Sequence, residues 1–167
     1  MPAIEELSEA LLECLKEVSA LLDHGVTVAG SQQDALVRND AEDIVLTCNS
    51  YYEVLRRLAQ ADERAAAVAE RIAESVGIDA RRDMESVLEV LDSMYKPLMA
   101  AELSRICALA RRLKDANEAN STLLRNGLES ITTCLRIVAQ EPEPSVYSNK
   151  ANLAGAGANT LSLDSRV

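Results

Sequence analysis

Residues 41–76 contain neither glycine nor proline, and their apolar side chains recur at alternating spacings of three and four. This rhythm keeps one line of side chains on a single helix face, with Asp62 as the one misfit in the line. The apolar members are Ile44, Cys48, Tyr51, Leu55, Leu58, Ala65, Ala69, Ile72 and Val76. A helix of this length spans roughly 50 Å, which predicts an extended helical bundle.

The composition limits what can fill the core of such a bundle. The 167-residue chain has no phenylalanine or tryptophan, although 48% of its residues are hydrophobic. Alanine, leucine and valine must therefore do the packing, and these side chains suit close contact between helices. We predict an all-α fold: an elongated antiparallel helical hairpin or bundle of about four helices with a flexible C-terminal tail.

Local signals divide the chain into a single helical domain, residues 1–140, and a tail, residues 141–167. The tail contains prolines and glycines and has no helical period, which is typical of a flexible segment. A proline inside a helix removes a backbone hydrogen bond, so Pro97 predicts a kink or a new helix start near residue 97. The predicted helices lie near residues 4–38, 41–76, 80–96 and 97–139.

Glycines and capping residues mark the other expected boundaries. Gly25 and Gly30 each disfavour a helix interior by about 1 kcal/mol, so we expect a kink or short break at residues 25–30 of the first helix. Asn39 or Asp40 is expected to cap the second helix. Gly77 is expected to end that helix, because glycine adopts the left-handed backbone conformation of a helix terminus.

The stretch NEANSTLLRNG, residues 117–127, has the composition of a loop, but the apolar rhythm passes through it without losing phase. The helix is therefore expected to continue. Asn120 and Gly127 then fall on the apolar stripe, where a glycine lets two backbones approach and a buried asparagine fixes register or partner. Two interpretations stay open for Asn117 and Asn120: they satisfy each other inside the bundle, or they face a binding partner.

The formal net charge of −10 argues against nucleic acid and anionic membrane surfaces as partners. No stretch approaches the roughly 18 apolar residues of a membrane span, and the acidic start of the chain does not resemble a signal peptide. The four cysteines are isolated among apolar neighbours, which is typical of reduced core residues. We therefore expect a cytoplasmic protein with no membrane span.

The sequence offers little support for an enzyme. His24 is the only histidine, so histidine-rich zinc sites and Ser-His-Asp triads lack their residues. Glycine-rich phosphate loops, paired cysteines and the Glu-x-x-His pair of di-iron bundles do not occur in the sequence either. We predict a protein that is not an enzyme and needs no cofactor or metal.

The stretch LKDANEANSTLLRNGL, residues 113–128, resembles a motif of the FlgN family, the flagellar type III export chaperones. The stretch ALVRNDAEDI between the first two helices, and the single tyrosine after the last helix, Tyr147, are also similar. Gly25, Gly30 and the long tail depart from the family pattern. The family's Leu…Asn-x-x-Asn-x-x-Leu-Leu pattern is matched by Leu113, Asn117, Asn120, Leu123, Leu124 and Leu128.

This resemblance implies a cytoplasmic chaperone that holds the hook–filament junction proteins FlgK and FlgL unassembled and competent for export. In the family, the C-terminal helix and tail carry client binding, and a tail tyrosine is linked to docking on the export-gate protein FlhA. Carried over to this chain, Tyr147 would be the residue that docks on FlhA. The client surface would include Asn117, Asn120, Leu124, Leu128, Ile131 and Leu135.

The apolar stripes also fit a second class of protein, a non-enzymatic coiled-coil scaffold that dimerises through them. A plain scaffold needs neither asparagines on the stripe nor a tail with spaced apolar residues, so these features favour the chaperone. A homodimer stays open as an alternative assembly.

Overall fold

The computed structural model describes residues 4–77, 87–89, 91 and 94–139, and every regular element among them is helical. Three long helices account for nearly all of these residues, and residues 87–89 form a further short helical stretch. The prediction of an all-α fold is confirmed. The long helices are α1 (Ile4–Arg38), α2 (Ala41–Val76) and α4 (Tyr95–Val138).

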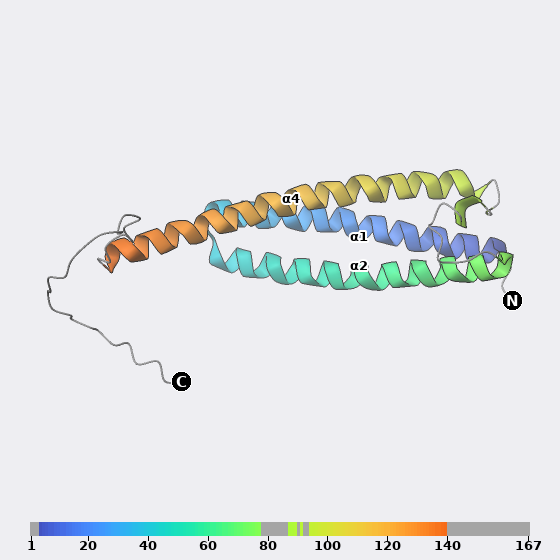
Figure 1. The fold of residues 1–167 in the computed structure, drawn as a ribbon, viewed down its shortest axis with the longest axis horizontal. Coiled ribbons are helices and arrows are strands. Elements are labelled where there is room, and N and C mark those ends of the chain that lie inside the picture. Colours follow the sequence, from blue (N-terminus) through green and yellow to red (C-terminus); the bar gives the residue numbers. More distant parts are fainter. Residues whose placement is uncertain (1–3, 78–86, 90, 92–93, 140–167) are drawn as a thin grey trace, which may run out of the picture. The chain divides into compact units, whose positions relative to one another are not determined.

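The chain forms two compact units, residues 1–129 and residues 130–167. Within the first unit, α1 and α2 make an antiparallel hairpin, and the part of α4 that belongs to this unit packs along the hairpin (Figure 1). Thirteen residues of α1 are buried, against five in α2 and five in α4. Helix α1 therefore provides most of the core, and α2 and α4 pack on it.

The buried surface of α1 is wider than the single stripe that the sequence suggested. Leu12, Leu15 and Leu22 are buried together with the predicted Leu11 and Val18. A helix that packs on two neighbours needs a second apolar row, and these leucines supply it. The core forms two clusters: one contains Leu7, Leu11, Leu12, Leu15, Ala65, Ile72, Val87, Leu91, Tyr95 and Met99, and the other Val18, Leu21, Leu22, Ala29, Ala61, Leu109 and Leu113.

Two residues form the connection between α1 and α2. Asn39 has a φ of 55°, and its N–H donates to the Leu36 carbonyl at 3.1 Å. The Asp40 N–H donates to the Ala35 carbonyl at 3.0 Å, which completes the Schellman pattern that closes a helix C-terminus. Asp40 then caps α2, because its Oδ1 accepts from the Asp43 N–H at 3.1 Å. The prediction of a cap at this position is confirmed, and Asn39 ends the preceding helix.

The glycines in α1 do not interrupt it, so the short break considered from the sequence is wrong. Hydrogen-bonded helix runs from Ile4 to Arg38 through both Gly25 and Gly30. Gly25 is buried where three helices meet: a Cβ placed on it would lie 3.4 Å from Leu113 Cδ2 and 3.5 Å from Val54 Cγ1. Its missing side chain lets α2 and α4 approach α1 closely. Gly30 has no such neighbour, because a Cβ there would meet no atom within 4 Å.

The ends of the other helices agree with the sequence where the structure describes them. Gly77 follows the last residue of α2 with a φ of 74°. Pro97 is the third residue of α4, where its missing N–H has no helical acceptor to lose, so the predicted helix start near residue 97 is confirmed. Most of the predicted helix 80–96 and all of the tail 141–167 lie outside the described residues.

Three of the four cysteines contradict the prediction that they are core residues. Cys48, Cys107 and Cys134 are exposed, and only Cys14 is partly buried. Helical spacing places a residue on a face of its own helix, but it does not show whether another helix covers that face. None of the helices described by the structure has a stretch long and apolar enough to cross a membrane.

The role of Gly25 leads to a paired prediction about stability. We expect Gly25→Leu to lower the free energy of unfolding by about 1–3 kcal/mol, because its side chain would overpack against Leu113 and Val54. Gly30→Leu should instead raise it by about 0.5–1 kcal/mol, because leucine is the better helix former and meets no neighbour. Urea unfolding followed by circular dichroism measures both. Equal stability of the two variants would contradict the close three-helix contact at Gly25.

Candidate partner-binding site

Helix α4 continues through residues 117–127 without interruption, so the loop-like composition of this stretch is misleading, as the apolar rhythm predicted. The polar residues of the stretch therefore lie on different faces of a helix, and some of them face the hairpin. Two of them, Asn117 and Asn120, contact the α1–α2 hairpin.

Asn120 lies inside the bundle and is only 3% exposed. Its amide Nδ2 donates to the Ala29 carbonyl at 2.9 Å and to Gln32 Oε1 at 3.0 Å, and both acceptors belong to α1. Its Oδ1 is buried, and no hydrogen-bond donor reaches it. A half-satisfied buried amide lowers stability, but it fixes which residues of α1 and α4 face each other.

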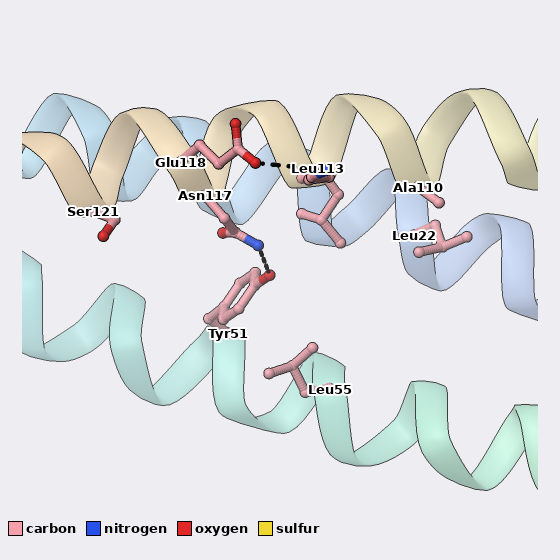
Figure 2. Close-up of a pocket in the computed structure, with 9 residues that line it drawn as sticks. Leu22, Tyr51, Leu55, Ala110, Leu113, Asn117, Glu118 and Ser121 are labelled. Atoms are coloured by element: carbon pink, nitrogen blue, oxygen red, sulfur yellow. Dashed lines mark hydrogen bonds and ion pairs between the residues drawn. The ribbon is translucent and has the colours of Figure 1, made fainter.

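Asn117 contacts the other helix of the hairpin. Its Nδ2 donates to the Tyr51 hydroxyl of α2 at 2.5 Å, and both side chains are half-buried. Figure 2 shows Tyr51 reaching up from α2 to meet Asn117 on the facing side of α4. One interpretation of the sequence was that Asn117 and Asn120 form hydrogen bonds with each other. The side-chain amides instead donate to other residues. The Nδ2 of each asparagine donates to a different helix of the hairpin, Asn117 to α2 and Asn120 to α1.

Gly127 does not act as expected from its place on the stripe. It is exposed, and a Cβ placed on it would meet no atom within 4 Å. The prediction that this glycine allows a close approach between two backbones is wrong. The physical reason is that burial along the stripe has already ended at this point.

The last buried residue of α4 is Asn120, and Leu123 is half-buried. Beyond them the helix carries large apolar side chains that are exposed, and spacings of four, three and four place these on one face of the helix. We call this set the exposed face of α4. It consists of Leu124 (43% exposed), Leu128 (65%), Ile131 (56%) and Leu135 (64%).

The sequence-predicted site residues therefore fall into two groups. Asn117 and Asn120 are engaged within the bundle, whereas the four aliphatic residues of the exposed face are open to solvent. Tyr147 lies outside the described residues. The sequence analysis missed Tyr51 and Gln32 as the polar partners of the two asparagines, although Tyr51 stands on the predicted stripe of α2.

Charges around the exposed face are mixed. Arg125, Glu129 and Arg136 lie on the same part of α4 as the four aliphatic residues. This pattern of an apolar stripe flanked by both signs of charge is typical of a helix surface that packs on another amphipathic helix. Among the residues that the structure describes, no group of three or more potential metal ligands gathers anywhere.

The family model described as FlgN protein matches residues 1–155 of this chain. The chain belongs to the FlgN family. The match covers all three long helices and extends past the end of α4. Membership implies a role as a flagellar export chaperone. Neither a curated protein nor a solved structure matches the chain.

The geometry of Asn120 predicts opposite effects for two substitutions. We expect Asn120→Leu to raise the free energy of unfolding by about 1 kcal/mol, because it removes an unsatisfied buried carbonyl oxygen. Asn120→Asp should lower it by about 3 kcal/mol or more, because the new carboxylate is buried against the Ala29 carbonyl without a counter-charge. Chemical denaturation measures both values.

A loss of stability in Asn120→Leu would contradict this account of the site. It would mean that the hydrogen bonds to Ala29 and Gln32 outweigh the buried oxygen, and that they hold α4 on α1.

Proposed function

We propose that this protein is a cytoplasmic chaperone that binds flagellar hook–filament junction proteins of the FlgK and FlgL type. It keeps them unassembled until type III export, and it binds them through the exposed face of α4. Family membership supports the general role. The observation that supports the finer proposal is that no residue of α4 after Asn120 is buried, while large apolar side chains from Leu124 onward are exposed.

The exposed face has enough apolar surface to hold a client. Burying one leucine or isoleucine side chain stabilises a complex by about 1.5–3 kcal/mol, and four such residues lie on this face. Part of that energy is offset by the lost freedom of the two proteins. Contiguous apolar side chains on a helix surface are a recognised mark of an interaction site.

The client segment that fits this surface is an amphipathic helix. Proteins that polymerise through amphipathic terminal helices would associate with each other if these helices stayed uncovered, and a chaperone helix can cover such a stripe by side-by-side packing. On the chaperone, the contact surface would be the apolar stripe of α4 with the mixed charges that flank it.

In this proposal Asn117 and Asn120 do not contact the client. They hold α4 in place on the hairpin. Their hydrogen bonds to Tyr51, Ala29 and Gln32 hold the first part of α4 on the hairpin. The buried part of the helix thereby fixes the residue at which the exposed face begins. Asn120→Leu should for this reason leave client affinity unchanged.

Two substitutions within the exposed face test the client site. We expect the double variant Leu128→Asp, Leu135→Asp to lose detectable binding to purified FlgK and FlgL in isothermal titration calorimetry, because it places two charges in an apolar contact. Its unfolding midpoint should stay unchanged, since both side chains are about two-thirds exposed. Leu98→Asp is the matched control on the same helix, half exposed and outside the face.

Two results would contradict the proposed function. One is a wild-type protein that binds neither FlgK nor FlgL. The other is an elongated dimer whose mass does not change with concentration and which excludes both clients, because the apolar stripes would then serve a coiled-coil scaffold.

We further propose that Tyr147 docks the loaded chaperone on the export-gate protein FlhA, which extends the resemblance to the family. Tyr147→Ala is expected to weaken binding to the cytoplasmic part of FlhA while client binding stays intact. Pull-down of FlhA by the chaperone–client complex, with calorimetry of the client alone, measures the two effects separately. Equal loss of both would contradict this division of roles.

A further inference from the structure

A groove runs between α2 and α4 in the first unit, with α1 as its floor. One part of it, about 460 Å³ in volume, has Tyr51 and Leu55 on the α2 side and Ala110 and Asn117 on the α4 side (Figure 2). A second part, about 350 Å³, lies along Leu55, Leu58, Ala59 and Asp62 of α2. The two parts are adjacent, because Leu22 of α1 and Leu55 of α2 line both.

The apolar stripe of α2 explains why this groove exists. The helix buries Val54 and Ala61 on the edge of the stripe that faces α1. Leu55, on the other edge, stays 43% exposed, and Leu58 is half-buried. Half of the stripe is therefore covered by α1, and the other half opens into the groove. Apolar side chains at helical spacing on an open groove wall are suited to a further helix.

Charged side chains line both parts of the groove. Asp62, the one misfit in the predicted stripe of α2, lines the groove on the α2 side. Lys114 lines it on the α4 side, and Arg111 is exposed one turn before it. Glu118 lies 3.8 Å from Lys114, but both side chains are more than two-thirds exposed, so this pair neutralises the wall weakly.

We propose that this groove is a second docking site, and that it takes an amphipathic helix of the exported client. The helix would carry basic residues along the edge that faces Asp62 and acidic residues along the edge that faces Lys114. This inference rests on the proposed function, since it assumes the same client. The groove is a different surface from the client site proposed above, because none of its residues belongs to the exposed face of α4.

The shape of the groove favours a helix over other occupants. Both walls and the floor are helices, whose backbone groups are already paired, so an extended peptide would find no strand edge to join. The groove is open along its length, so a small molecule would remain largely exposed. With α2 and α4 both packed on α1, a client helix in the groove would complete a four-helix bundle. The Tyr51–Asn117 hydrogen bond spans the two walls near one end.

Tryptophan wedges at exposed alanines test the site. Ala59 and Ala110 line the groove, whereas Ala67 and Ala108 lie on the same helices, are equally open to solvent and line neither part of it. We expect Ala59→Trp and Ala110→Trp to weaken the Kd for purified FlgK or FlgL about tenfold, because the indole occupies space the client helix needs. Ala67→Trp and Ala108→Trp should stay within about twofold of wild type.

A photo-crosslinking amino acid at the same positions gives a second readout. Placed at 59 or 110, it should form an adduct with the client. Placed at 67 or 108, it should not. This measurement does not depend on how the wedges affect folding.

The outcomes separate this proposal from the one on which it rests. Failure of wild-type protein to bind either client would overturn the proposed function and the groove together. Normal client binding by both wedge variants, with no adduct from 59 or 110, would overturn the groove alone. An adduct with a second copy of the chaperone, instead of the client, would overturn the choice of occupant.

Discussion

The packing of both α2 and α4 on α1 is the constraint on which the rest of the structure depends. Because this helix is buried on two sides, the core needs no phenylalanine or tryptophan, and rows of leucine on one helix serve two interfaces. At Gly25 a Cβ would already contact both Leu113 and Val54, so a large side chain has no room there. With α1 as the common support, α2 and α4 turn part of their apolar surface toward a groove and not toward the core.

Much of this fold follows from local rules that the sequence states directly. The three–four rhythm predicted the helices, and Asp40, Gly77 and Pro97 predicted their ends, because caps and prolines act within a turn of their own position. The second buried row of α1 was missed, because a rhythm identifies one face and says nothing of the number of neighbours. The effect of Gly25 was also predicted incorrectly. The sequence shows that a glycine lowers the stability of its own helix, but it does not show that this glycine lies against two distant segments.

The surface that we propose for client binding could be predicted only in part. The apolar rhythm of α4 keeps its phase past Asn120, so no sequence pattern marks the residue where burial stops. Burial in the structure supplies the missing information: Asn120 is the last buried residue of α4, and large apolar side chains beyond it are exposed. The asparagine motif resembled a client surface, yet its two amides bind the hairpin, and the neighbouring leucines stay exposed.

The most direct test of this account is hydrogen–deuterium exchange along α4, with and without FlgK or FlgL. In the free protein, amides of residues 106–120 should exchange slowly and those of residues 124–138 faster, because the buried residues in this half of α4 lie in the first stretch. Added client should slow exchange over residues 124–138. Uniform protection along the free helix, or no change in residues 124–138 on binding, would contradict the claim that this face is held open for a partner.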